Sequence, residues 1–209
     1  MSRARVESYK RDGGQFLTLR IGTGALEESF LDAVDAAIEQ ADLDSAVTCV
    51  ILRIVQSAGV PDAATAPSLP ADVIARRLRL DASILAARRM PKPVVLLQDG
   101  TLAGECIGLF AAADIVLATQ ESVLRPGGVP AALLGMVPAL QRRSDGVRQA
   151  LLCLLEGRDL DAHAARHLGL VTDVLPAERL EPVLDALLRG IAAAGPTGVA
   201  LLKAASTPS

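Results

Sequence analysis

The sequence predicts an α/β fold in which parallel β-strands are flanked by helices. Short apolar runs rich in Val, Ile and Leu alternate along the chain with longer segments whose apolar residues recur at helical spacing. Of the 209 residues, 51% are hydrophobic, but only three are Phe, one is Tyr and none is Trp. The core is therefore expected to consist of Leu, Val, Ile and Ala. We assign residues 1–209 to a single domain, with a core over residues 15–175 and a short C-terminal helical segment over residues 176–209.

The opening of the chain predicts a parallel strand pair. Residues 15–21 alternate as in a half-buried strand. Residues 26–41 carry apolar side chains at helical spacing, and residues 46–54 form a continuous β-branched run, which is typical of a strand covered on both faces. The order strand, helix, strand indicates a crossover connection between two parallel strands.

The rest of the chain continues the alternation. Residues 56–70 have no apolar period, which predicts a long loop of the kind that often carries function. Residues 125–138 hold glycines and prolines and are also predicted to be a loop. Strands are predicted at residues 94–97, 115–118 and 171–175. Helices are predicted at residues 71–89, 104–113, 146–155, 161–168 and 178–194, with a break at Gly195-Pro196 and a last turn or two to Ala205.

Composition and charge argue against several function classes. The net charge of −3 requires no broad basic surface, and the scarcity of aromatic side chains argues against single-stranded nucleic-acid binding. No uninterrupted apolar run reaches the ~18–20 residues of a membrane span, and the N-terminus shows no apolar leader. Nucleotide-binding motifs such as GxGxxG are absent from the sequence. We therefore expect a cytoplasmic protein with no nucleic-acid or membrane partner.

The cysteines and histidines form no metal-ligand motif. Cys49, Cys106 and Cys153 lie far apart in apolar runs, as small buried hydrophobic residues do. His163 and His167 are four residues apart on a predicted helix, but no acidic residue lies between them and no third ligand is evident. A solvent-facing helix is the simpler interpretation, and we predict no metal site.

Three motifs occur in order along the chain. The first is Lys92-Pro93-Val94-Val95, followed by Asp99-Gly100, Gly104 and Asp114. The second is Gly135-Met136-Val137-Pro138, and the third runs from Gly157-Arg158-Asp159-Leu160-Asp161-Ala162 to His167-Leu168-Gly169-Leu170-Val171. Together they resemble the crotonase (enoyl-CoA hydratase/isomerase) superfamily, over roughly residues 15–205. The resemblance implies a crotonase-like fold of repeated ββα units, with parallel sheets flanked by helices and a truncated C-terminal helical region.

The resemblance also implies a site at the junction after residues 94–97. Members of this family bind acyl thioesters, usually of coenzyme A, and hold the thioester oxygen with two main-chain N–H groups that stabilise an enolate. One donor corresponds to the amide of Glu105, at the start of a helix, and the other to the amide of Val60. No cofactor is required, since the coenzyme A thioester is the substrate. The resemblance places Ala25, Ala58, Gly59 and Gly104 at positions that bind the coenzyme A moiety.

The sequence departs from the family at two catalytic positions. Hydratases of the family activate water with two glutamates, and the matching positions are Gly108 and Ala131. Hydration by two glutamates is therefore not expected, whereas isomerisation, decarboxylation and C–C bond chemistry stay open. The identity of the proton donor also stays open, with four candidate residues. One of them, Asp62, is included in the predicted catalytic site. These candidates are Glu105, Asp62, Arg125 and Cys106; Asp114 is expected to be structural.

The function implied is that of a divergent enoyl-CoA hydratase/isomerase-like protein, an isomerase or lyase. Its substrate is expected to be an acyl thioester of coenzyme A or a carrier protein, in bacterial secondary metabolism such as a polyketide or nonproteinogenic amino-acid pathway. The alternative is a non-catalytic auxiliary subunit that assists a partner enzyme. Apolar helical faces and the resemblance both predict a homo-oligomer, a trimer or hexamer.

Overall fold

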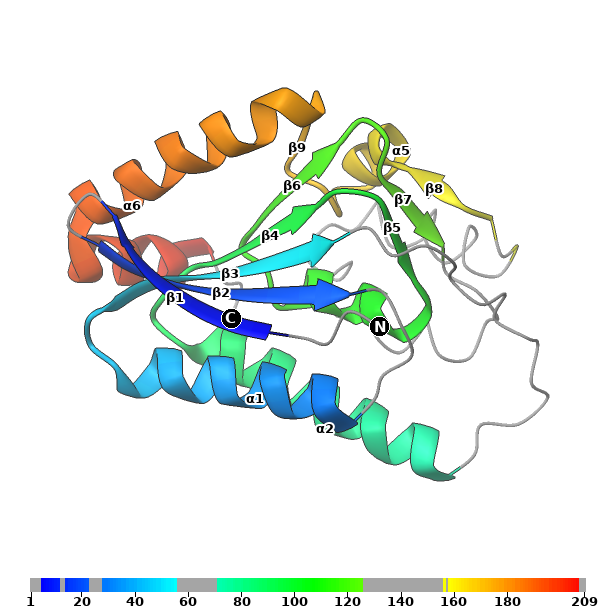
Figure 1. The fold of residues 1–209 in the computed structure, drawn as a ribbon, viewed down its shortest axis with the longest axis horizontal. Coiled ribbons are helices and arrows are strands. Elements are labelled where there is room, and N and C mark those ends of the chain that lie inside the picture. The colour runs from blue at the N-terminus through cyan, green and yellow to red at the C-terminus, as the bar shows by residue number, and fades with distance from the viewer. Residues whose placement is uncertain are drawn as a thin grey trace.

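A six-stranded sheet forms the centre of the structure, which is a computed structural model that describes residues 5–11, 14–22, 28–55, 71–125, 156 and 158–206 (Figure 1). Its strands, in order across the sheet, are β1 (Arg5–Arg11), β2 (Gly14–Gly22), β3 (Val47–Val55), β4 (Val94–Gln98), β6 (Ile115–Thr119) and β9 (Asp173–Leu175). β1 pairs antiparallel with β2, and the other neighbouring pairs in this sheet are parallel. The predicted α/β class with a mostly parallel sheet is confirmed.

Helices cover both faces of the six-stranded sheet. Helices α1 (Glu28–Leu43) and α2 (Ala71–Arg89) lie on one face, and α6 (Ala177–Ser206) lies on the other (Figure 1). On β4, Val94 and Leu96 belong to the apolar cluster with α1 and α2, whereas Val95 and Leu97 belong to the cluster with α6. This burial on both faces explains why β4 is a continuous apolar run and not an alternating one.

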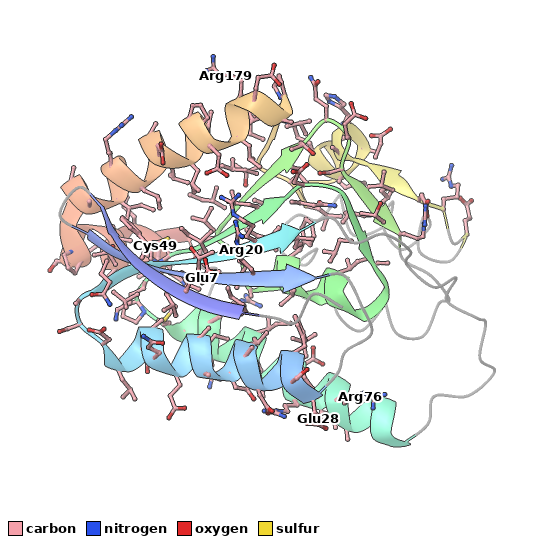
Figure 2. The ribbon with its side chains drawn as sticks, in the orientation of Figure 1. Glu7, Arg20, Glu28, Cys49, Arg76 and Arg179 are labelled. Atoms are coloured by element: carbon pink, nitrogen blue, oxygen red, sulfur yellow. The ribbon has the colours of Figure 1, made fainter. Side chains whose placement is uncertain are left out.

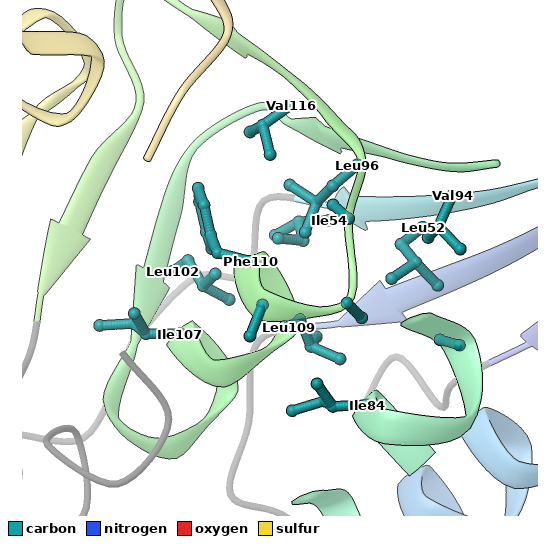
Figure 3. Packing of buried hydrophobic residues seen from close by; sticks show 14 of the residues in the cluster. Leu52, Ile54, Ile84, Val94, Leu96, Leu102, Ile107, Leu109, Phe110 and Val116 are labelled. Atoms are coloured by element: carbon teal, nitrogen blue, oxygen red, sulfur yellow. The ribbon is translucent and has the colours of Figure 1, made fainter. Parts of the chain in front are cut away.

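The apolar cluster with α1 and α2 also includes a short 3-10 helix, η1 (Gly104–Ala111). Figure 3 shows Ile84 of α2 and Leu109 and Phe110 of η1 in the same cluster as Leu96 of β4 and Ile54 of β3. Each such side chain contributes about 1.5–3 kcal/mol when it is fully buried. The packing of η1 against the sheet therefore fixes the segment that follows β4.

A second, smaller sheet continues from the large one. It contains β5 (Thr101–Ala103), β7 (Val123–Arg125) and β8 (Leu160–Asp161), in the order β5-β7-β8. Helix α5 (Ala162–His167) follows β8 directly. The Asp161 carboxylate caps α5 by accepting the Ala164 N–H at 2.7 Å, as aspartates at helix starts commonly do.

Most predicted elements are found, with shifted ends. The helix predicted at residues 71–89 has those bounds, and the parallel pair at the start of the chain is confirmed. Residues 146–155 lie outside the described residues. Strand β1 was not predicted, because its sequence, RVESYKR, has almost no apolar residues. Such a sequence is possible in a strand at the edge of a sheet. The short strands β5, β7 and β8 were also not predicted, and Arg125 ends β7 instead of starting a loop.

One predicted helix has a different geometry. The segment expected to be a helix over residues 104–113 is the 3-10 helix η1, which ends at Ala111. Gly104 and Gly108 give this segment two glycines in eight residues, which weakens the preference for an α-helix. The tighter 3-10 winding is typical of short connecting helices.

Helix α6 bends where the sequence predicts a break. At Gly195 the backbone has φ 68° and ψ 168°, and Pro196 follows. Before the bend, Leu184 and Leu188 are buried against the sheet. Among the described residues, α6 alone is long and apolar enough to cross a membrane by length and composition, a criterion that core helices of soluble proteins also meet.

A buried ion pair connects α6, on one face of the sheet, with α2, on the other face. Lys203 Nζ lies 2.9 Å from Asp114 Oδ2, and it donates to the carbonyl oxygens of Ala87 (3.0 Å) and Lys92 (2.8 Å). Asp114 Oδ2 also accepts the Val94 N–H at 2.9 Å. The side chains of Lys203 and Asp114 are only 6% and 15% exposed. The pair therefore joins α6 to the end of α2 and to the start of β4.

Replacing Lys203 by Met is expected to lower the free energy of unfolding by ~3–5 kcal/mol, because it leaves the Asp114 carboxylate buried without its cation. Urea unfolding followed by circular dichroism measures the loss. The matched control is Arg189→Met on the exposed side of the same helix, which is expected to change the free energy by less than about 0.5 kcal/mol.

The double variant Lys203→Met/Asp114→Asn is expected to lose less stability than the sum of the two single variants, because both charges are removed together. Additive losses would show that the two side chains act independently and would contradict the pairing.

Candidate functional site

The carboxyl ends of the central parallel strands meet at one edge of the large sheet. Ile54 of β3 is in register with Gln98 of β4, and Gln98 is in register with Ala118 of β6. Ligands of open α/β sheets bind outside this edge. β3 and β4 are neighbouring strands in the sheet. In the sequence, β3 is followed by residues 56–62, which include the predicted donor Val60, and β4 is followed by Asp99-Gly100 and then by the predicted donor Glu105.

A turn at Gly100 redirects the chain from β4 towards η1. Gly100 has a φ of 111°, a conformation that glycine adopts far more readily than other residues. Its carbonyl oxygen accepts two hydrogen bonds, from the Val123 N–H at 3.2 Å and from Gln98 Nε2 at 3.0 Å. The Asp99-Gly100 turn noted in the sequence thus redirects the chain after β4 and is held by hydrogen bonds to the Gly100 carbonyl oxygen.

Buried polar side chains hold this turn in place. Gln98 Nε2 also donates to the Val123 carbonyl at 3.1 Å, and Ser122 Oγ donates to the Gln98 carbonyl at 2.9 Å. Thr119 Oγ1 donates to Asp99 Oδ1 at 3.2 Å and lies 3.0 Å from Ser122 Oγ. Gln98, Thr119 and Ser122 are at most 1% exposed. Buried networks of this kind make the local backbone rigid when their members are hydrogen-bonded.

The start of η1 presents main-chain amides at the same junction. Its N-cap residue, Ala103, is extended (φ −125°, ψ 156°) and makes no side-chain hydrogen bond to the helix. The first N–H groups of a helix have no carbonyl partner within it and carry partial positive charge. The Glu105 amide belongs to this first turn, as the sequence predicts. The side chains of Glu105 and Cys106 lie outside the described residues, so their functions stay predictions.

The other predicted site residues lie outside the part of the chain that the structure describes. These are Ala25, Ala58, Gly59, Val60 and Asp62, and Ala131 at one of the positions that hold a glutamate in hydratases. Their part in the site stays a prediction. Gly104 and Gly108 fall within η1, and Gly108 is buried there.

The candidate Arg125 and the expected structural residue Asp114 both interact with other parts of the protein. Arg125 Nε donates to Asp159 Oδ2 at 2.9 Å, and both side chains are 43% exposed. The guanidinium is therefore engaged by a carboxylate of the chain. Asp114 lies at the amino end of β4, the opposite edge of the sheet from Gln98, and it has the structural role that the sequence predicts.

The described cysteine and histidines provide neither a nucleophile nor a metal centre. Burial, with a contribution from the Asp114 carboxylate, raises the pKa of the Cys49 thiol well above its usual range, so the thiol stays neutral. His163 and His167 are exposed on α5. In the described ranges, no three His, Cys, Asp or Glu side chains form a group that could hold a metal ion.

The buried network was missed by sequence reasoning. Gln98 and Thr119 each end an apolar run, at the last residue of β4 and of β6. A polar residue at the end of a buried strand was the available signal, because such a residue needs hydrogen-bond partners that only a neighbouring turn can supply.

Replacing Gln98 by Leu is expected to lower the free energy of unfolding by about 1–3 kcal/mol, because the side-chain amide that bonds two buried carbonyl groups is lost. Thermal or urea unfolding measures the effect. Gln120→Leu, two positions from Ser122 and exposed, is the control and is expected to leave stability nearly unchanged. Equal effects of the two substitutions would contradict a structural role for the Gln98 amide.

Comparison with known proteins identifies similar sequences. A sequence model of the enoyl-CoA hydratase/isomerase family matches residues 20–208. A probable enoyl-CoA hydratase of Mycobacterium tuberculosis is 29% identical over 181 residues, which are 80% of this chain and 63% of that protein. A trans-2-decenoyl-(acyl-carrier-protein) isomerase of Streptococcus mutans is 31% identical over 108 residues, 49% of this chain and 40% of that protein. The chain thus spans less than two thirds of the length of these relatives.

Solved structures share the fold. An enoyl-CoA hydratase of Mycobacterium smegmatis superimposes with a TM-score of 0.77 at 24% identity, over 98% of this chain and 82% of that one. An enoyl-CoA hydratase/isomerase family protein of Silicibacter pomeroyi gives 0.78 at 21% identity, over 97% of this chain and 89% of that one. At these sequence identities, the similarity shows that the fold is shared and does not show a shared activity or site.

Proposed function

The chain belongs to the enoyl-CoA hydratase/isomerase family, and on this premise we propose that it binds an acyl thioester and stabilises the enolate formed from it. The two donors are the main-chain amides of Val60 and Glu105. Ala25, Ala58, Gly59 and Gly104 contact the coenzyme A moiety. The observation that carries the proposal is the first turn of η1, which follows β4 and the short strand β5 and whose amides have no capping side chain.

The geometry supports a main-chain site for developing negative charge. An enolate oxygen is stabilised by donors that are already in position when the charge develops. The Gln98 network and the Gly100 turn fix the chain just before η1, and Leu109 and Phe110 fix η1 itself in the core. Little reorganisation is then needed at the Glu105 amide when a thioester carbonyl becomes an oxyanion.

The reaction we propose is enolate chemistry without two-glutamate hydration. A glycine at position 108 and an alanine at position 131 supply no carboxylate. Isomerisation of a double bond needs only an enolate and one group that moves a proton, which makes it the simplest fit. Asp62 is the proposed proton carrier, with the Glu105 carboxylate as the alternative.

The thioester carrier is either coenzyme A or a carrier protein. The Streptococcus mutans relative is named as an isomerase of an acyl-carrier-protein thioester, and other relatives are named as enoyl-CoA hydratases. We propose an acyl thioester of bacterial secondary metabolism as the substrate, a cytoplasmic location and a trimeric or hexameric assembly, on the strength of the family resemblance.

A second candidate is a non-catalytic subunit that binds a thioester and assists a partner enzyme. The buried glycine at position 108 favours it, because the helix that would carry a catalytic carboxylate carries none there. The two candidates share the oxyanion hole and differ in turnover, so a panel of enoyl and β-ketoacyl thioesters separates them. Turnover of any panel member by the isolated chain favours the enzyme.

The proposed amide donor is tested by a pair of substitutions at one position. Glu105→Pro removes the N–H, and proline is tolerated in the first turn of a helix because no intrahelical bond is lost. Glu105→Ala keeps the N–H. The proline variant is expected to lower kcat by about 10²–10³-fold, whereas the alanine variant keeps most of the activity. Loss of activity in both variants would assign the function to the carboxylate and not to the amide.

Binding tests the same donor when turnover is absent. Butyryl-CoA has a thioester carbonyl oxygen, whereas S-butyl-CoA is a thioether and has none. Isothermal titration calorimetry measures the affinity of the protein for each ligand. The thioester is expected to bind more tightly to the unsubstituted chain, and Glu105→Pro is expected to reduce that difference. Circular dichroism confirms that the variant is folded. Equal affinities for the two ligands in the unsubstituted chain would contradict an oxyanion hole.

A further inference from the structure

The C-terminal part of α6 is a helical unit of its own. Gly195 has a positive φ (68°) and a ψ of 168°, which is outside the helical region, and Pro196 follows it. Proline suits the first position of a new helix, because its missing N–H would have no partner there. Apart from neighbours along the chain, no atom of the described residues lies within 4 Å of the position that a Cβ would take at Gly195. Residues 196–206 can therefore change direction at Gly195 without unwinding residues 177–194.

The two parts of α6 are attached to the sheet in different ways. The first part buries four apolar side chains in one cluster with the strands, namely Leu180, Leu184, Leu188 and Ile191. In residues 196–205 the buried side chains are Val199 and Lys203, which lie four residues apart on one side of the helix. Leu201 and Leu202 are 67% and 69% exposed. The stretch from 196 to 205 thus has one buried apolar side chain, that of Val199.

The attachment through Lys203 is polar. Its Nζ pairs with Asp114 at 2.9 Å and donates to the carbonyl oxygens of Ala87 and Lys92. When this segment moves away from the sheet, the ammonium and the carboxylate both return to water, which replaces the lost hydrogen bonds. Local opening is easiest where few apolar contacts are lost. Residues 196–206 are therefore expected to open at a lower free energy than the rest of α6.

The thiol of Cys49 lies beneath this segment. Cys49 is on β3, is 0% exposed and belongs to the same apolar cluster as Val199. Burial raises the pKa of its thiol, and the nearby charges of Asp114 and Lys203 raise it and lower it, respectively. Figure 2 shows Cys49 at the end of the sheet where the C-terminal part of α6 lies. The segment that is easiest to open therefore covers a thiol that is neutral and shielded from water.

We propose that residues 196–206 form a latch, which opens as a unit about Gly195 and admits small disulfides to Cys49. In the open state the thiol is hydrated and loses its proton to water, and the thiolate attacks one sulfur of the disulfide. A new S–S bond joins Cys49 to that half of the disulfide, and the other half leaves as a thiolate. In the closed state Cys49 is enclosed by close-packed side chains with no room for the added group, so the adduct holds the latch open. A thiol reductant removes the adduct and lets the latch close.

Labelling of Cys49 measures the opening of the latch. Replacing Cys106 and Cys153 by Ala leaves Cys49 as the one cysteine of the sequence, and 5,5′-dithiobis(2-nitrobenzoate) is the disulfide probe. Adding Lys203→Met is expected to raise the labelling rate at least ~10-fold, because a buried carboxylate that loses its cation favours the open state, where it is hydrated. Arg189→Met, on the exposed side of the first part of α6, is the matched control and is expected to leave the rate unchanged.

Val199→Ala tests the latch with the ion pair intact, and it also serves if the Lys203 variant does not fold, which circular dichroism shows. It is expected to raise the labelling rate, whereas Ile84→Val, which trims a buried side chain in the other apolar cluster, is expected to leave the rate unchanged without urea. The labelling rate is expected to depend only weakly on urea, because opening a short segment exposes little surface compared with unfolding of the whole chain. Equal acceleration by the two substitutions, or a urea dependence equal to that of global unfolding, would overturn the proposal.

Hydrogen exchange followed by mass spectrometry shows which residues open. Amides of residues 198–206 are expected to exchange faster than those of residues 180–194. Labelling Cys49 with the probe is expected to remove the remaining protection of residues 198–206, and dithiothreitol is expected to restore it. Cys49→Ala treated with the probe is the control and is expected to show no change. Equal protection along α6 before labelling, or protection of residues 198–206 that survives labelling, would contradict the latch.

Discussion

The Asp114 carboxylate is the point on which the described architecture depends. It accepts the first N–H of β4 and pairs with Lys203, which also bonds the carbonyl groups at the end of α2 and before β4. A charged pair this buried is stable only when both partners are present and further hydrogen bonds complete their shells. Both conditions are met, so the amino end of β4 is fixed against helices on both faces of the sheet.

The carboxyl end of β4 is fixed by side-chain hydrogen bonds and not by an ion pair, and it leads to the candidate site. There the Gln98 side chain bonds the Gly100 and Val123 carbonyl groups, and the turn delivers the chain to η1. The strand thus connects a structural ion pair at one edge with the candidate oxyanion site at the other. A main-chain donor does not depend on the identity of its own side chain, so the proposed enolate stabilisation does not require a carboxylate at position 108, where the chain has glycine.

Much of the fold could be predicted from the sequence, because the buried strands and the helices carry clear apolar patterns. Strand β4 is apolar at four successive residues since both of its faces are covered, and the bend of α6 is marked by Gly195-Pro196. Strand β1 lacks such a pattern because an edge strand needs few apolar contacts. The site was predicted only in part. Motifs indicated the Asp99-Gly100 turn and the start of η1. The Gln98 network was missed, because its partners lie in and next to the turn between β6 and β7, more than twenty residues away, and the polar residue at the end of β4 does not by itself name them.

In the proposed site, main-chain amides at the start of η1 polarise the carbonyl of a bound thioester. Infrared difference spectroscopy of butyryl-CoA labelled with ¹³C at the thioester carbonyl tests it most directly, because hydrogen bonding to that oxygen weakens the C=O bond. If those amides bond the thioester oxygen, the carbonyl band of the bound ligand lies at lower wavenumber than in water. A band unchanged at saturating protein, or no binding of the ligand, would contradict it.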